Sequence, residues 1–170
     1  EAIAGSTSAR LAAVCEVDEG RIAWATERHP VAVHRDIAAL VADPDVDVVA
    51  ICLPHNLHRP AALQAIAAGK DVLLEKPMAI SVAECDEINA AAAAAGVTVG
   101  VSHNRLFVPS IERARALIDS GDVGAPVFIR HRIGIHDPYP GWRSVPEMVG
   151  GGLLSDSGAH AFYVLQHLFG

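Results

Sequence analysis

The sequence predicts an α/β protein with a doubly wound parallel sheet, followed by the start of a second, α+β domain. Two observations lead to this fold class. Short apolar strand segments alternate with helical segments through residues 1–105, and strands that alternate with helices form parallel sheets. Beyond residue 105 the alternation stops and a mixed pattern begins. We therefore expect two domains, over residues 1–105 and 106–170.

The alternation begins with two strands of different strength. Residues 11–16 form an apolar run typical of a buried strand, and a stronger run covers residues 46–53 before Pro54 ends it. Between these strands we expect a helix over 19–28, a short strand at 31–33 and a helix over 36–42.

The next elements carry clearer end signals. An Ala-rich helix over 59–68 is closed by Gly69, and a strand follows at 72–74. Ser81 and Glu84 form the pattern of a capping box, which begins a helix that runs to Gly96. A further strand is expected over 97–101.

The region beyond residue 105 is organised differently. Pro109 begins a helix that Gly121 ends, and residues 126–135 are a long β-like run. Residues 136–149 predict a structured loop, and Gly150–Gly152 open a final helix. These glycines either let a ligand approach the backbone closely or form a flexible turn.

Composition excludes several classes of protein. The chain has 170 residues, 51% of them hydrophobic, with 20 acidic and 13 basic side chains and a formal charge of −7. No basic cluster favours nucleic acid, and no apolar run approaches the ~20 residues that span a bilayer. The cysteines, Cys15, Cys52 and Cys85, are odd in number and far apart, which indicates reduced core thiols and no metal site. We expect a cytoplasmic protein.

Lys76 is the first candidate for chemistry. It lies in a Glu75-Lys76-Pro77 turn directly after the strand at 72–74. Ligands of open α/β sheets bind outside the carboxyl ends of the strands, and a desolvated lysine there can take part in proton transfer. The alternative is a solvated lysine on a loop.

Glu16 indicates the cofactor. An acidic residue at the end of the second strand of a Rossmann fold binds the ribose hydroxyls of NAD and repels the 2′-phosphate of NADP. Asp18 and Glu19 compete for this role, and an exposed acidic turn is the alternative. No Gly-x-Gly-x-x-Gly turn occurs in these residues. We therefore expect that the first strand and turn of the fold are missing, which would leave two inner strand edges unpaired.

Two further groups of residues are candidates. The loop after the strand at 46–53 lies on the same rim as Lys76 and contains Leu53, Pro54, Asn56 and His58. We expect Asn56 and His58 to face a cofactor, and the alternative is that His58 caps the following helix.

Asp156 and His160 are four residues apart, on one face of a helix. They either act as a proton-accepting unit or form an ordinary surface pair.

These motifs together resemble the Gfo/Idh/MocA oxidoreductase family. The resemblance rests on four segments, which are Pro54-His-Asn-Leu-His58, Gly69 to Pro77, Val101-Ser-His-Asn-Arg105 and Gly150 to His160. It covers nearly the whole chain. The resemblance implies a nucleotide-binding domain followed by a C-terminal domain with an open sheet. It also implies assembly into homo-oligomers and NAD- or NADP-dependent oxidation of sugars, inositols or related polyols.

The resemblance implies roles for particular residues. Lys76, Asp156 and His160 would be the catalytic group, with His160 accepting the hydroxyl proton, Lys76 stabilising the oxyanion and Asp156 orienting the substrate. The turn before Pro77 would contain a cis peptide bond. NAD would contact Glu16, Leu53, Pro54, Asn56, His58, Glu75, Lys76 and Pro77. The substrate pocket would include Asn104, Arg105, Trp142 and Arg143.

Two other functions occur among proteins with these motifs. Some members cleave glycosides with the help of tightly held NAD, and a few bind nucleotide as regulators without turnover. Retention of Lys76, Asp156 and His160 argues against the regulator, whereas the residues do not separate the dehydrogenase from the glycoside-cleaving enzyme.

Overall fold

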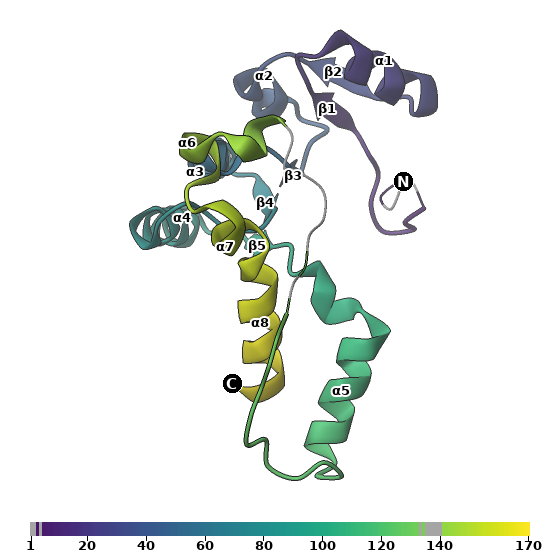
Figure 1. Ribbon diagram of the computed structural model, residues 1–170. Helices are drawn as coiled ribbons and strands as arrows, with labels where there is room; N and C mark the ends of the chain where they lie inside the picture. The colour runs from purple at the N-terminus through teal and green to yellow at the C-terminus, as the bar shows by residue number, and fades with distance from the viewer. Residues whose placement is uncertain (1–2, 4, 133, 135–140) are drawn as a thin grey trace.

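The computed structural model of the chain describes residues 3, 5–132, 134 and 141–170 (Figure 1). Strands and helices alternate through its first part, as predicted. In order they are β1 Ala13–Cys15, α1 Glu19–Arg28, β2 Ala32–His34, α2 Ile37–Ala42, β3 Val48–Ile51, η1 His55–Leu57, α3 His58–Ala67, β4 Asp71–Leu74, α4 Val82–Ala95 and β5 Val99–Val101.

The second part of the described chain is helical. Its elements are η2 Asn104–Phe107, α5 Pro109–Asp119, η3 Gly141–Ser144, α6 Pro146–Val149, α7 Gly152–Asp156 and α8 Gly158–Phe169. Helices α5 and α8 contact each other and extend together away from the strands (Figure 1). None of the helices in the described residues is long and apolar enough to cross a membrane.

The strands form two separate parallel sheets. β1 pairs with β2, and β4 lies between β3 and β5. Among the described strands, β1 and β3 each have a partner on one side only, and residues of both line a cavity of about 1520 Å³. This agrees with the expectation of two unpaired inner edges.

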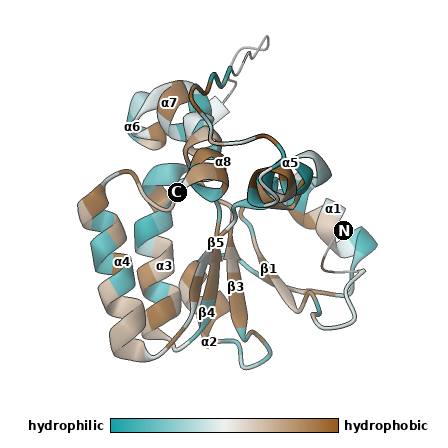
Figure 2. Ribbon diagram, turned by 90° about the horizontal axis from the view of Figure 1, so that it is seen from below, coloured by the Kyte–Doolittle hydropathy of each residue, from teal (hydrophilic) through white to brown (hydrophobic). Residues whose placement is uncertain are grey.

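The core lies between the three-stranded sheet and the pair α3 and α4, which cover one face of it (Figure 2). Alternate residues of β4 point to opposite faces, so Val72 and Leu74 are buried while Leu73 is 48% exposed. Three small residues of α3, Ala61, Ala62 and Ala65, are buried in the core. Their short side chains allow the helix to lie close to its neighbours.

The helix ends predicted from the sequence are largely confirmed. The Ser81 hydroxyl accepts a hydrogen bond from the Glu84 N–H, at 3.2 Å, and the Glu84 carboxylate accepts one from the Ile80 N–H, also at 3.2 Å. Gly96 ends α4 in the left-handed conformation, with φ of 69°. These contacts satisfy backbone groups that a helix end leaves unpaired.

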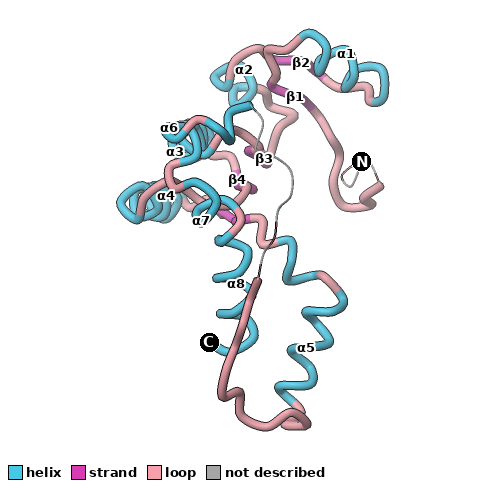
Figure 3. Tube along the Cα trace, in the orientation of Figure 1, coloured by secondary structure: helices cyan, strands magenta, loops and turns pink. Residues whose placement is uncertain are grey.

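The strand expected over residues 126–135 is wrong for the part that the structure describes. Residues 126–132 and 134 form a loop that runs back from the end of α5 (Figure 3). Val127 is 98% exposed and Phe128 is 75% exposed. Apolar alternation produces a strand only when a neighbouring strand accepts its hydrogen bonds, and no described strand lies beside this segment.

The end of the chain also differs from expectation. Part of the loop expected over 136–149 falls outside the described residues, and the remainder forms η3 and α6. The single final helix is divided into α7 and α8 at Ser157. Gly150 has φ of 77°, and a Cβ there would lie 2.6 Å from Cγ2 of Ile80. A glycine is therefore required for packing at this corner, which neither reading of the three glycines anticipated.

The three cysteines are free, and the prediction that they are core residues is wrong for Cys15 and Cys52, whereas Cys85 packs against the core. Cys15 and Cys52 are exposed, and Cys85 is of intermediate exposure. Cys15 and Cys52 line the cavity between the two sheets. An apolar run in a sequence does not reveal which of its residues faces such a gap.

Candidate active site

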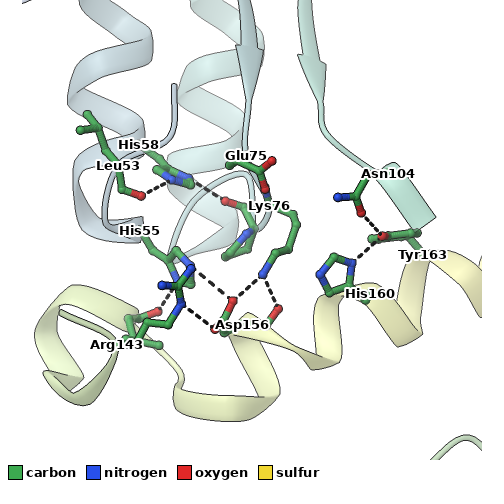
Figure 4. A network of polar contacts seen from close by, with 12 residues as sticks. Leu53, His55, His58, Glu75, Lys76, Asn104, Arg143, Asp156, His160 and Tyr163 are labelled. Carbon is green, nitrogen blue, oxygen red and sulfur yellow. Dashed lines mark hydrogen bonds and ion pairs between the residues drawn. The ribbon is translucent and has the colours of Figure 1, made fainter. Parts of the chain in front are cut away.

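Lys76 lies two residues beyond the end of β4 and points toward α7 (Figure 4). Its ammonium group donates hydrogen bonds to the backbone carbonyl of Asp156, at 2.9 Å, and to the Asp156 carboxylate. The Lys76 side chain is only 12% exposed. The alternative of a solvated loop lysine is therefore wrong. The Lys76–Pro77 peptide bond is cis, as the resemblance implied.

Asp156 is the centre of the charged cluster. It is buried, and besides Lys76 it has the Arg143 Nε 3.4 Å from Oδ2 and the His55 Nε2 3.8 Å from Oδ1. Burial alone would raise the pKa of Asp156, but the hydrogen bond and charge of Lys76, with the charges of His55 and Arg143, outweigh burial and lower it. The carboxylate is therefore held in its ionised form.

His160 lies on a different helix from Asp156, because α7 ends at Asp156 and α8 begins at Gly158. The predicted single helical face is thus wrong. The ring of His160 is bonded instead through Nδ1 to the hydroxyl of Tyr163, at 2.5 Å. Burial and the positive charges of Lys76 and Arg105 lower the pKa of His160 to about 4, despite the opposing effect of Asp156 and Glu75. The imidazole is neutral near pH 7.

His55 is part of the site, although sequence reasoning did not single it out. Its Nδ1 donates to the backbone carbonyl of Val149 at 3.0 Å, and its ring meets that of Trp142 edge-on at 4.9 Å. Burial lowers its pKa, outweighing the hydrogen bond to Val149 and the charge of Asp156. Its position directly after Pro54, at the end of a strand, was the signal that could have identified it.

His58 is among the residues that line the pocket beside Lys76, and its ring is also hydrogen-bonded within the protein. The side chain is fully buried, with Nδ1 2.8 Å from the carbonyl of Pro77 and Nε2 2.9 Å from the carbonyl of Leu53. It makes no capping hydrogen bond to α3. Both ring nitrogens are engaged within the protein, so His58 joins the loop after β3 to the turn after β4.

The predicted cofactor residues fall into two groups. Leu53, His58, Glu75 and Lys76 line a pocket of about 230 Å³, together with His55, Trp142 and other residues. Glu16 lines the large cavity between the sheets, which Leu53 and Pro54 also line. Leu53 therefore belongs to both spaces, and a dinucleotide extending from Glu16 toward Lys76 would pass it.

The side chains present fit the two ends of a dinucleotide. The Glu16 carboxylate follows β1 and accepts hydrogen bonds from the N–H groups of Val17 and Asp18, which lower its pKa. An ionised carboxylate suits a ribose diol. Near the other end, Oδ1 of Asn56 is buried without a hydrogen-bond partner among the described residues. The glycine-rich turn that holds a pyrophosphate does not occur in the 170 residues.

The predicted substrate residues also separate. Trp142 and Arg143 line the 230 Å³ pocket, with the Arg143 guanidinium 4.4 Å from the Trp142 ring centroid. Asn104 and Arg105 lie on η2, where both contact the Tyr163 hydroxyl. Tyr163 was also missed by the sequence reasoning. Its spacing of three residues from His160, which places two side chains on one helix face, was the available signal.

Comparison with known families gives two matches that together cover most of the chain. Residues 1–103 match the Gfo/Idh/MocA model described as an oxidoreductase family with an NAD-binding Rossmann fold. Residues 111–170 match the model of the Gfo/Idh/MocA C-terminal domain.

Individual relatives agree with these matches. The chain is 41% identical over 140 residues to 1-carboxy-3-chloro-3,4-dihydroxycyclohexa-1,5-diene dehydrogenase of Comamonas testosteroni, covering 81% of this chain and 35% of that protein. It is 36% identical to 1,5-anhydro-D-fructose reductase of Ensifer adhaerens, covering 81% and 42%. The solved structure of GenD2 from gentamicin A biosynthesis, in complex with NAD, is 27% identical with a TM-score of 0.85, covering 98% and 48%.

The chain spans less than half the length of each of these three proteins. The two family models nevertheless match both parts of the chain, since the first range includes Glu16 and Lys76 and the second includes Asp156 and His160. The chain therefore belongs to the Gfo/Idh/MocA oxidoreductase family and carries its NAD-binding Rossmann domain.

Proposed function

We propose that the complete protein is an NAD-dependent oxidoreductase that transfers hydride between a nicotinamide and a carbinol carbon of a sugar, inositol or related polyol. The observation that carries this proposal is the buried Lys76–Asp156 pair beside a neutral histidine. An ammonium group has three N–H donors, and two of those on Lys76 bind Asp156. The third has no hydrogen-bond partner among the residues that the structure describes, so it can bind a substrate oxygen.

The residues have complementary roles in the oxidation of an alcohol. When bound, NAD⁺ accepts the hydride, with its two electrons, from the carbinol carbon. The His160 imidazole accepts the hydroxyl proton as the C–O single bond becomes a carbonyl. Lys76 stabilises the negative charge that develops on the oxygen. Asp156 holds the Lys76 ammonium in place, and reduction reverses each of these steps.

The substrate class is supported by the names of the relatives and by the composition of the pocket. The two relatives described above are named for a dihydroxycyclohexadiene and for an anhydro sugar, both of which carry hydroxyl groups on a ring. In this chain Trp142 offers an aromatic wall, and Arg143 and Glu75 offer polar groups beside it. Such a wall with a few polar groups is suited to a polyhydroxylated ring.

The cofactor preference and the domain boundary are further parts of the proposal. The Glu16 carboxylate favours NAD because its charge would repel the 2′-phosphate of NADP. We place the boundary near residue 105, with the dinucleotide domain before it and the substrate domain after it. The matched ranges, 1–103 and 111–170, support this division.

The test is a screen of sugars, inositols and cyclic diols with the complete protein, which follows the formation of NADH or NADPH. We expect turnover with NAD⁺ and a loss of kcat on the order of 10²- to 10⁴-fold for Lys76→Met. Lys70→Met is the matched control. Lys70 precedes the opposite end of β4 and donates to the Asp43 carbonyl at 3.1 Å, so its loss should leave kcat unchanged.

Two results would contradict the proposal. One is full activity of Lys76→Met, which would remove Lys76 from the chemistry. The other is the absence of reduced nicotinamide with every alcohol, together with the release of sugar from a glycoside, which would indicate the glycoside-cleaving enzyme.

A further inference from the structure

A second polar cluster lies behind His160, on the side away from Asp156 (Figure 4). Its centre is the hydroxyl of Tyr163, a buried residue one turn after His160 on α8. The hydroxyl lies 2.5 Å from Nδ1 of His160, 3.2 Å from the backbone nitrogen of Arg105 and 3.5 Å from Oδ1 of Asn104. Tyr163 therefore connects η2 to the proposed proton acceptor.

The hydrogen inventory of this cluster determines which nitrogen of His160 carries its proton. A tyrosine hydroxyl has one hydrogen and two acceptor lone pairs. The Arg105 N–H can only donate, so it takes one lone pair, and Oδ1 of Asn104 can only accept, so it takes the hydrogen. The remaining lone pair faces Nδ1 of His160. Each of the three contacts of the Tyr163 hydroxyl is a hydrogen bond only if Nδ1 of His160 is protonated and donates to that lone pair.

Protonation at Nδ1 has a direct consequence for Nε2. Burial and nearby charges keep the His160 ring neutral near pH 7, and a neutral imidazole has a single N–H. Nε2 therefore has the free lone pair, and no described residue hydrogen-bonds to it. The charged groups that act on the ring are Lys76, Arg105, Asp156 and Glu75.

The surroundings of Tyr163 keep its hydroxyl in this position. The His103 ring packs against the Tyr163 ring, with centroids 4.2 Å apart, and the Arg105 donor is a backbone group whose place is determined by the η2 turn. A hydroxyl held by a packed ring and a backbone N–H has little freedom to reorient. Asp156, which the sequence suggested as the partner of His160, is instead bound to Lys76.

We propose that Tyr163 is a positioning residue that holds His160 in the tautomer protonated at Nδ1, so that Nε2 is the atom that accepts the substrate proton. The inference rests on the proposed function for its catalytic consequence. The tautomer itself is a property of the protein that exists without turnover. Asn104 has a part in it, because its oxygen takes the hydroxyl hydrogen that would otherwise be available to Nδ1.

The first test is direct observation of the tautomer in the complete protein, labelled with ¹⁵N in the histidine rings. We expect the His160 signals at neutral pH to show a protonated Nδ1 and an unprotonated Nε2. Tyr163→Phe keeps the ring and removes only the oxygen, and it should shift His160 toward the opposite tautomer. Asn104→Ala, at an exposed position, should do the same by freeing the hydroxyl hydrogen for Nδ1.

The second test is kinetic. For Tyr163→Phe we expect kcat to fall by about 10- to 100-fold with KM nearly unchanged, because the variant loses proton transfer and not substrate binding. In a His160→Gln background the same substitution should have no further effect on kcat. A merely structural role would lower the activity of both backgrounds alike.

The outcomes separate this inference from the proposed function. A wild-type His160 protonated at Nε2 overturns the inference, whatever the activity. So does a Tyr163→Phe protein with unchanged tautomer and kcat, while the dehydrogenase assignment would then stand. If no alcohol is oxidised but the tautomer responds to Tyr163→Phe and Asn104→Ala, the proposed function fails and the positioning role of Tyr163 is retained.

Discussion

At the scale of single residues, the site depends on one buried carboxylate. Asp156 accepts from Lys76, and Arg143 and His55 lie within 3.4 Å and 3.8 Å of its oxygens. Removing one partner of a buried ion pair leaves the other charge uncompensated, which costs more than the pair contributes. The pair therefore links stability to the proposed chemistry.

A double-mutant cycle on Lys76→Met and Asp156→Asn should reveal this coupling. We expect each single change to lower the free energy of unfolding by about 3 kcal/mol and the double change to cost much less than the sum. Urea unfolding gives the free energy of unfolding of the wild type, the two single variants and the double variant. The exposed pair Arg35–Glu19 is the control, and its coupling should be much smaller because solvent screens both charges. Additive effects at Lys76 and Asp156 would contradict a mutually compensating pair.

Three histidines should make the protein less stable as the pH falls. Burial lowers the pKa of His55, His103 and His160, the last from 6.5 to about 4. Between these values the unfolded chain binds protons that the folded protein does not, so the free energy of unfolding decreases as pH falls from 6.5 toward 4.

The pH dependence can be assigned by substitution. His160→Gln should give a shallower dependence in urea unfolding, whereas His131→Gln, at an exposed position, should leave it unchanged. Asp156 contributes at lower pH, because its pKa lies below the ordinary 3.8. An equal slope in the wild type and His160→Gln would show that His160 is not shielded from protonation.

At the scale of elements, β4 packs in the core and also positions Lys76, the candidate catalytic lysine. Its buried Leu74 lies against the core, its exposed Leu73 points to the other face, and Lys76 follows two residues later. The strand must be firmly packed if Lys76 is to stay beside Asp156.

Truncation of two neighbouring leucines should show that the two faces of β4 contribute differently to stability. Leu74→Ala leaves a cavity among buried residues and should cost about 3 kcal/mol of unfolding free energy. Leu73→Ala removes the same atoms from a position that is 48% exposed and should cost less than about 1 kcal/mol. Chemical denaturation measures both. Equal losses would mean that the face carrying Leu73 is also buried in solution.

The N-terminus of α4 provides a second prediction at this scale. Ser81→Ala removes the acceptor of the Glu84 N–H and should cost about 1 kcal/mol. Ser110→Ala in the first turn of α5, where Val108 is the N-cap residue, should be nearly neutral in the same unfolding experiment. A comparable loss at both serines would contradict the capping role.

At the scale of the whole molecule, distant segments are joined at the site. The Lys76–Asp156 bonds connect residues 80 apart in sequence, and the His55–Val149 bond connects residues 94 apart. These contacts attach α6 and α7 to the strand ends. The position of Asp156 therefore depends on His55 as well as on Lys76.

His55→Ala should loosen α6 and α7 without affecting the sheet. A buried hydrogen-bonding group that is left unsatisfied costs about 1–3 kcal/mol, which corresponds to amide hydrogen exchange that is roughly 5- to 150-fold faster in the loosened segment. We expect faster amide hydrogen exchange over residues 146–156 and unchanged exchange in β4. His131→Ala is the control. Uniformly faster exchange would indicate global destabilisation and not local release.

Local signals explain why much of the fold was predictable. Some signals act over only a few residues, namely the helix caps at Ser81 and Gly96 and the apolar runs of β3 and β4. Such signals can be recognised from the sequence alone. The run over 126–132 has the same local pattern, yet it forms no strand. Strand formation depends on a neighbour elsewhere in the protein, which a local pattern does not contain.

Motifs and periodicity along the chain are sufficient to identify the family, the order of strands and helices and the placement of Lys76 beyond a strand end. The hydrogen-bond partners of Asp156 and His160, in contrast, depend on the packing of the folded molecule. The four-residue spacing paired Asp156 with His160, whereas the fold binds Asp156 to Lys76 and His160 to Tyr163. The physical reason is that a break at Ser157 turns the two side chains to different neighbours. Burial then sets their charges, and burial is a property of the packed molecule.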